Sequence, residues 1–455
     1  MMAGGRSRLA AGVAMLSVVA MSASDSPAQE SGAVATSGRQ ASDTATTDFV
    51  TNGVRVILRR NAANDVIAVN LYLLGGVRQV TATNAGIEPF LLAASERGTA
   101  RFPGERARLT AEALGSTFVI EPTDDWTMFG FRALRATLDS TWQLFSDRIM
   151  APSLEQSAVE LIRAQLLTEA RGRRDSPDAL VSFLADSLGF AGHPYGLSPF
   201  GTERSMESLT VEALRAYREE QFVTSRMLLV VVGNVDRETV ERLVATSLGT
   251  MPKGSYAWKA PEPPEPLEGA LLVVQRPLPT NYLLGRYTGP AASNWEDYQA
   301  LRVATAILSG RLFNEIRSRR NLTYAVDAMF TERAVSAGGI YITTVLPDSA
   351  LTLIRREIVR LQSEYVEAAS LGRLVQGFLT EYFLNNETNA EQGDFLARAL
   401  LYRGDYRAAG RFVDELRQVS PGDVRRVAQK YIRDIRWAYI GNPARITRER
   451  ATGLD

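Results

Sequence analysis

The groups that could do chemistry in this chain are limited by two features of its composition. Its 455 residues contain one histidine, His193, and no cysteine. A tetrahedral zinc site needs at least three nitrogen, sulfur or carboxylate ligands, and the common sites rely on His or Cys. Ser/His/Asp catalysis would have to use His193, and no nucleophile motif accompanies it. The sequence therefore predicts no zinc site in this chain and gives little support to a serine-type active site.

The composition is that of an ordinary soluble globular protein with two domains or more. A chain of 455 residues is too long for one hydrophobic core. Its hydrophobic fraction is 45%, and 51 Lys and Arg residues balance 51 Asp and Glu residues. Because the charges leave no net field, we expect no binding to nucleic acid or to acidic lipid.

The N-terminus has the layout of a secretory signal peptide. Arg6 and Arg8 precede an apolar run over 9–23, and small residues follow up to Ala28. The run is shorter than the roughly 20 residues of a membrane span, which favours a cleaved signal over 1–28 rather than an uncleaved anchor. Residues 29–47 are polar and small, and we expect them to be disordered. The mature chain is thus expected to be exported, periplasmic and not an integral membrane protein.

Periodicity predicts an α+β domain over 48–252. Alternating or continuous apolar runs indicate strands, and apolar residues three and four apart indicate helices. The expected strands are 49–59, 66–74, 116–120, 126–134 and 227–232, and the expected helices are 87–97, 138–149, 157–172 and 177–188.

A similar order of elements recurs after a Pro- and Glu-rich stretch, which we interpret as a linker over 253–269. The second domain is expected over 270–445, with a helix that begins at a capping box formed by Ser293 and Glu296. Its predicted strands are 270–275, 282–287, 322–330, 339–345 and 437–440, and its predicted helical segments include 311–319 and 351–361. Two α+β halves with one plan are therefore expected.

Four segments carry a family resemblance. They are GGVRQVTATNAGIEPFLLAASERGT at 75–99, GHPYGLSPFGTERSMESLTVEALRAYREEQF at 192–222, MLLVVVGNVD at 227–236 and RLFNEIRSRRNLTYAV at 311–326. Together they resemble the M16 (pitrilysin/insulinase) metallopeptidases of the bacterial and mitochondrial-processing-peptidase type. The resemblance covers roughly 47–442. It implies two similar LuxS/MPP-like α/β sandwich halves that form a clamshell around an extended peptide.

Active members of the family carry an inverted zinc motif, His-x-x-Glu-His, on a helix of the first half. Two histidines four residues apart share one helical face, and the Glu activates the metal-bound water. In this chain Pro89 and Ala93 stand at the histidine positions and Leu92 at the Glu position. Glu169 stands where the family has its distal Glu ligand, although an ordinary solvated helix residue is the more common reading of an isolated Glu. The resemblance thus implies a degenerate motif without metal.

A second family constellation is retained. Family members supply an Arg and a Tyr, seven residues apart, from the C-terminal half toward the zinc, and Arg317 and Tyr324 match this spacing. A guanidinium and a phenol can hold a substrate carbonyl and stabilise a developing oxyanion. The alternative reading is an exposed helix Arg and a half-buried strand Tyr. Asn321 replaces the usual Gly of this turn, and Asn tolerates the left-handed conformation that the turn needs.

The leading hypothesis is an exported non-catalytic subunit of a heteromeric M16-type peptidase. A partner subunit with an intact His-x-x-Glu-His motif would hold the zinc, while this chain would hold no cofactor and supply Arg317, Tyr324 and half of a chamber for peptides or unfolded polypeptides. The alternative is a peptidase-like binding or assembly protein with no role in hydrolysis. Retention of the Arg and Tyr favours the first hypothesis.

Overall fold

The computed structural model describes residues 46–453. The predicted signal peptide at 1–28 and residues 29–45 lie outside the described residues. The predicted disordered segment ends too late, because Thr46 and Thr47 belong to strand β1 (Thr46–Thr51), which pairs antiparallel with β2 (Val54–Arg60). These two strands also replace the single strand predicted over 49–59. The chain turns between them at Asn52 and Gly53, which both have positive φ.

The first half is built on a six-stranded mixed sheet with the order β1-β2-β6-β3-β5-β4. Its remaining strands are β3 (Val66–Leu74), β4 (Thr117–Pro122), β5 (Trp126–Leu134) and β6 (Met227–Gly233). Its helices are α1 (Ile87–Ala94), α2 (Arg106–Ala113), α3 (Leu138–Met150), α4 (Gln156–Asp175), α5 (Pro177–Gly189), α6 (Glu203–Ser208), α7 (Val211–Gln221) and α8 (Arg237–Ala245).

The second half is built on a five-stranded sheet with the order β7-β11-β8-β10-β9. The strands are β7 (Ala270–Gln275), β8 (Asn281–Ala291), β9 (Val326–Thr331), β10 (Val335–Thr344) and β11 (Arg436–Gly441). The helices are α9 (Trp295–Leu312), the π-helical segment η8 (Phe313–Ser318), α10 (Pro347–Ser363), α11 (Ala368–Leu384), α12 (Asn389–Arg403), α13 (Ala408–Arg417), α14 (Pro421–Tyr431) and α15 (Arg448–Thr452). Two similar α+β halves are thus confirmed.

Strand β6 shows why the first sheet is apolar on both faces. Its residues Met227, Leu229 and Val231 pack into the core beneath helices of the first half. The alternate residues, Leu228, Val230 and Val232, pack on the opposite face against α12. Successive side chains of a strand point to opposite faces, so a strand covered on both sides must be apolar throughout.

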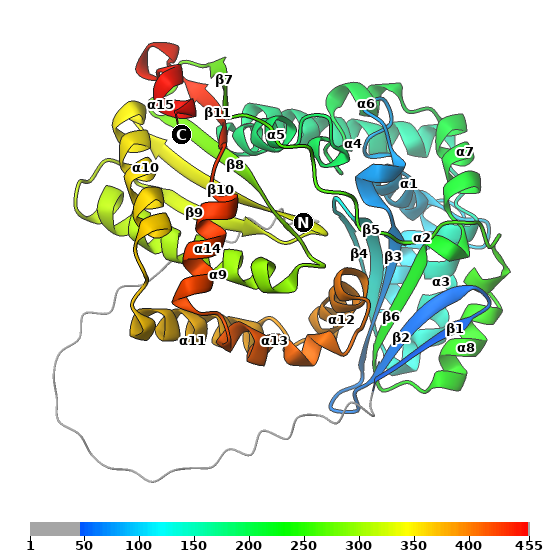
Figure 1. The fold of residues 1–455 in the computed structure, drawn as a ribbon. Coiled ribbons are helices and arrows are strands. Elements are labelled where there is room, and N and C mark those ends of the chain that lie inside the picture. Colours follow the sequence, from blue (N-terminus) through cyan, green and yellow to red (C-terminus); the bar gives the residue numbers. More distant parts are fainter. Residues whose placement is uncertain (1–45, 454–455) are drawn as a thin grey trace, which may run out of the picture. The chain divides into compact units, whose positions relative to one another are not determined.

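The two halves exchange helices. Helix α5 belongs to the first half by sequence and packs on β8 and β11 of the second sheet. Helix α12 belongs to the second half and packs on β3 and β6 of the first sheet (Figure 1). Each sheet therefore completes its core with a helix that comes from the other half.

Buried polar contacts join the halves at the same junction. Asp186 of α5 forms an ion pair with Arg286 of β8, in which Arg286 Nε lies 3.0 Å from Asp186 Oδ1. The turn between β4 and β5 contacts the turn between β9 and β10, where Arg333 Nη1 lies 2.6 Å from an oxygen of Asp124. We infer that the chain acts as one block, since separating its halves would expose these groups.

Two predictions about the second half are wrong in detail. Helix α9 is capped by Asn294, whose side chain accepts from the Asp297 amide, and not by Ser293. Strand β9 begins at Val326 rather than at 322, because the preceding residues form a turn fixed by hydrogen bonds from the Thr323 side chain. Within residues 46–453 no helix is both long and apolar enough to cross a membrane.

Candidate functional site

Helix α1 carries the degenerate zinc motif and is packed as a core helix. Leu92 is fully buried in the main core of the first half, and Ala93 packs against the edge of that core. Pro89 lies in the first helical turn, where the amide that proline lacks has no intrahelical acceptor. None of these three side chains has a ligand atom, so this helix does not fit a zinc ion.

Glu169 lies on α4, which packs on α1 and leaves the Glu169 side chain exposed. Partial desolvation raises the pKa of Glu169, and the charge of Arg173 opposes that effect. Among the described residues no three His, Cys, Asp or Glu side chains are grouped closely enough to hold a metal ion. The geometry therefore gives Glu169 no companion ligand.

A buried ion pair that sequence reasoning missed anchors this helix. Glu88, one residue before Pro89, lies 2.6 Å from Arg226 Nη2, with side chains only 3% and 1% exposed. The Thr127 hydroxyl donates to Glu88 at 2.7 Å and the Tyr217 hydroxyl at 2.9 Å. Burial alone would lower the pKa of Arg226, but the charges and hydrogen bonds of Glu88 and Tyr217 together outweigh burial and raise that pKa. The one sequence signal was that Glu88 is the only charged residue in α1.

The depression beside Pro89 is too small for a substrate. Its volume is about 10 Å³, at or below the space that one water needs. The lining includes Pro89, the network residues Glu88 and Thr127, and Gly76 and Val77 from the segment after β3. Leu92, Ala93 and Glu169 do not line this depression, so it is not a metal pocket.

Arg317 and Tyr324 are both exposed on the second half, on either side of one turn. Segment η8 ends next to a turn in which the Asn321 amide donates to the Arg317 carbonyl and the Leu322 amide to Ile316. Asn321 has φ 52, which confirms the left-handed turn expected from its sequence. Tyr324 is 90% exposed, and the Arg317 guanidinium lies 5.0 Å from the centre of the Phe313 ring. Both polar groups are therefore presented outward.

The structure does not bring this pair to the degenerate motif of the same chain. Helix α1 packs on α4, α7, β4 and β5, whereas η8 packs on α9, α10 and β9. π-Helical turns within α-helices occur frequently at functional sites. Arg317 and Tyr324 therefore do not face the α1 helix of their own chain. An oxyanion contact by this pair would have to be made to another molecule.

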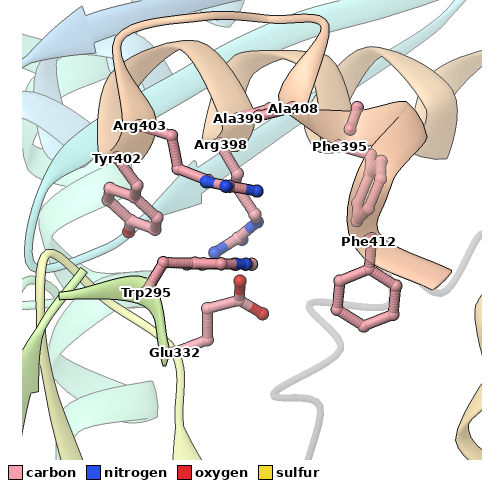
Figure 2. A pocket seen from close by; sticks show the side chains of 10 residues that line it. Trp295, Glu332, Phe395, Arg398, Ala399, Tyr402, Arg403, Ala408 and Phe412 are labelled. Atoms are coloured by element: carbon pink, nitrogen blue, oxygen red, sulfur yellow. The ribbon is translucent and has the colours of Figure 1, made fainter. Parts of the chain in front are cut away.

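A second small cavity lies where α12 and α13 meet α9. Figure 2 shows Arg403 stacked over the Trp295 ring, with Glu332 and Arg398 beside it. The guanidinium of Arg403 lies 4.4 Å from the ring centre, and both groups donate to Glu415. The cavity measures about 20 Å³, room for about one water. It is a packing defect between helices rather than a ligand site.

His193 packs within the loop that follows α5. Its Nδ1 accepts from the Tyr195 amide at 3.2 Å, and its ring packs edge-on against the Tyr195 ring. Its Nε2 lies 3.1 Å from the Glu262 carbonyl oxygen of the linker. Burial lowers the pKa of His193, while the contact with the Glu262 carbonyl raises it. These contacts hold the linker.

Comparison with known proteins supports the family resemblance over most of the chain. The family profile described as "Insulinase (Peptidase family M16)" matches residues 55–203, and "Peptidase M16 inactive domain" matches residues 208–378. An uncharacterized zinc protease of Mycobacterium leprae is 26% identical over 396 residues, which are 84% of this chain and 87% of that protein. Subunit 1 of the mitochondrial cytochrome b-c1 complex of Caenorhabditis elegans is 22% identical over 413 residues, 86% of each chain.

Solved structures share the fold. The peptidase M16 inactive domain from Pseudomonas fluorescens superimposes with a TM-score of 0.80 at 19% identity, covering 87% of this chain and 98% of that one. A protease from Helicobacter pylori superimposes with a TM-score of 0.79 at 18% identity, covering 87% and 99%. At these identities the likeness establishes the architecture.

Proposed function

The chain belongs to the M16 peptidase family, and from that premise we propose that it is an exported, non-catalytic subunit of a heteromeric zinc-dependent peptidase. One observation carries the proposal. Helix α1 has lost both histidine ligands, at Pro89 and Ala93, and the Glu of the motif, at Leu92. Arg317 and Tyr324 nevertheless keep the family spacing and are exposed. A chain that had left hydrolysis altogether would have no chemical reason to keep such a pair exposed.

In this proposal the chemistry is shared between chains. A zinc ion in a partner subunit with an intact His-x-x-Glu-His motif would polarise the scissile carbonyl and activate water. The Arg317 guanidinium and the Tyr324 hydroxyl of this chain would donate hydrogen bonds to the carbonyl oxygen of a bound peptide. Because the halves of this chain are joined by buried contacts, it would present the pair on a rigid support.

Export is the second element of the proposal and rests on the sequence of residues 1–28. The chain would lose its signal peptide and work in the periplasm. N-terminal sequencing of protein from the envelope fraction tests this element. A first residue between Ser24 and Glu30 supports it, whereas an intact Met1 in the cytoplasm contradicts it.

A second candidate is a binding or assembly protein that takes no part in hydrolysis. It is favoured by the similarity to subunit 1 of a mitochondrial cytochrome b-c1 complex, which extends over 86% of this chain. This candidate would keep the two-half scaffold for contacts with other proteins, and Arg317 and Tyr324 would be ordinary surface residues.

Copurification from the native envelope separates the two candidates. The proposal requires a copurifying M16 subunit with the intact motif, no stoichiometric zinc in this chain alone by elemental analysis, and peptide hydrolysis by the two chains together but not by this chain alone. A tightly held, chelator-sensitive zinc in the isolated chain would contradict it. Assembly without any contribution of this chain to hydrolysis would favour the second candidate.

A further inference from the structure

Arginines are in excess around Arg317 and Tyr324. The end of α9, segment η8, the turn after it, and the facing side of α10 with the residue that follows it carry six arginines and three glutamates. The arginines are Arg311, Arg317, Arg319, Arg320, Arg356 and Arg360, and the glutamates are Glu315, Glu357 and Glu364. We call these nine residues the basic patch. The chain as a whole has no net charge, so this local excess is a property of the surface and not of the composition.

One carboxylate serves three guanidinium groups at the centre of the basic patch. Glu315 lies 3.3 Å from Arg319 and 2.7 Å from Arg320, and it also pairs with Arg356. Burial would raise the pKa of Glu315, and the charges of Arg320, Arg356 and Arg319 outweigh it and lower the pKa. Arg356 also lies 3.8 Å from Glu357, so two carboxylates face these three cations, and the guanidinium side chains remain 40–76% exposed.

The arginine of α10 nearest its end is paired on both sides. Arg360 lies 3.3 Å from both Glu357 and Glu364 and is 48% exposed. Arg311, at the end of α9, has a buried Nη1 without a hydrogen-bond partner. Burial and then the charge of Arg360 lower the pKa of Arg311, and the charges of Glu357 and Glu364 partly offset them. Over the whole basic patch, six guanidinium groups still face three carboxylates.

Exposed apolar side chains adjoin the basic patch. The Thr343 amide donates to the Ala325 carbonyl, and the Thr344 hydroxyl to the Leu322 carbonyl, so the end of β10 lies beside the turn that carries Tyr324. Val345 and Leu346, which follow this strand end, are 56% and 43% exposed. An aromatic ring, two aliphatic side chains and surplus guanidinium groups thus share one surface.

We propose that the basic patch binds carboxylate side chains of an extended peptide whose backbone lies against Arg317 and Tyr324, and so selects acidic peptides as substrates. The assignment of a peptide as the ligand rests on the proposed function. Arg319 and Arg320 follow Arg317 within three residues and are exposed, so a peptide held at Arg317 would pass the segment that carries them. This proximity favours a substrate peptide over the surface of a folded partner.

The expected selectivity is moderate and dependent on salt. Each exposed charge pair contributes little, so two or three such contacts favour an acidic peptide by about tenfold. At an ionic strength of about 0.3 M the Debye length is below about 8 Å. Salt should then screen these exposed charges and remove most of the preference for the acidic peptide.

Fluorescence anisotropy with the purified full chain tests the proposal. The probes are a fluorescein-labelled peptide of Ala, Ser and Glu, and the same peptide with Gln or Lys at each Glu position. We expect the Glu peptide to bind about tenfold more tightly than the Gln peptide at low salt. The double variant Arg319→Gln/Arg360→Gln should lose this preference, and Arg319→Lys/Arg360→Lys should keep most of it. Arg237→Gln/Arg242→Gln is the matched control, since both arginines are helix residues with 54–56% exposure and one acidic partner each.

Equal affinity for the Glu and Gln peptides, no binding of either, or an equal loss in the control variant would overturn the proposal. If the double Gln variant instead fails to assemble with a zinc-binding subunit, and the Glu peptide has no advantage, the basic patch belongs to a subunit interface. The proposed function is tested separately by hydrolysis in the reconstituted complex. Its failure would leave a measured peptide preference unchanged, so the two results are distinguishable.

Discussion

Asp124 and Arg333, which are 209 residues apart in the sequence, meet at 2.6 Å between the hairpin turns of the two halves. The neighbouring Asp125 accepts from the Ala334 amide at 2.8 Å and from the hydroxyls of Tyr402 and Tyr195. Arg333 also lies 4.1 Å from the centre of the Phe190 ring. The turn of each half thus supplies partners to buried polar groups of the other, which explains why the halves form one block.

Arg333→Leu should destabilise the protein strongly. Arg333 is 4% exposed, and its removal leaves Asp124 without its counter-charge and Asp186 with Arg286 alone. Breaking a buried ion pair on one side typically costs about 3 to 5 kcal/mol. Denaturant unfolding followed by circular dichroism measures this loss. The control Arg242→Leu removes an exposed pair with Asp139 and should cost less than about 1 kcal/mol. Equal effects of both variants would show that the contact is not a major determinant of stability.

Asp124 should make stability depend on pH in the mildly acidic range. Burial, partly offset by Arg333, raises the pKa of Asp124 from 3.8 to about 6. The native state therefore holds this proton more tightly than the unfolded state. Its contribution to stability is complete below about pH 4 and is lost as pH rises through about 6, with a limiting slope of about 1.4 kcal/mol per pH unit.

Asp124→Asn tests that dependence, because asparagine does not titrate. The difference in unfolding free energy between wild type and this variant should fall from pH 4 to pH 6 and then stay constant. Asp139→Asn, at an exposed carboxylate paired with Arg242, is the control for removing a surface charge. A difference that rises with pH would mean that the ion pair with Arg333, and not burial, dominates at Asp124.

Glu88→Gln should weaken the first half, because it leaves the Arg226 guanidinium buried without a counter-charge. The expected loss is about 3 kcal/mol in unfolding free energy, and a lower thermal midpoint should accompany it. Glu105→Gln is the control, since that side chain is 58% exposed and pairs with exposed arginines. If the two variants were equally stable, α1 would be held by its apolar contacts alone.

Local elements were predictable wherever one pattern dominated the sequence. Strands β5 and β7 have the predicted bounds because alternation or an apolar run ends at clear turn residues. The start of α9 was predicted one residue too early, since Ser293 and Asn294 are both good caps and only the structure shows which side chain accepts. The residues 322–325 look like a strand by composition, and long-range hydrogen bonds of Thr323 make them a turn.

The polar network between the halves could not be predicted in the same way. Asp124 and Asp125 lie in a turn, where acidic residues are common for local reasons. Arg333 lies in another hairpin turn, where a charged residue looks like an ordinary surface residue. Their partners depend on which turns meet in space, and no periodicity records that. By contrast, Arg317 and Tyr324 could be identified before the structure because their spacing in one short segment matches a family pattern. Their exposure required the structure.

Arg317→Ala and Tyr324→Phe should lower the activity of the assembled peptidase without changing its assembly. Tyr324 is 90% exposed and Arg317 is exposed, so neither variant removes packing that the fold needs. If the pair holds the carbonyl oxygen at a partner's zinc, the loss of one donor should reduce kcat/KM by on the order of 10²-fold.

The measurement is peptide hydrolysis by reconstituted complexes whose subunit ratio has been verified. Arg242→Ala serves as the matched control, because it removes an exposed arginine of the first half and should leave kcat/KM unchanged. A loss confined to the two site variants, at unchanged thermal stability, would assign the pair to the transition state, since a purely structural role would also shift unfolding. Wild-type kcat/KM in both site variants would instead favour a binding or assembly protein, because the exposed pair would then contribute nothing to hydrolysis.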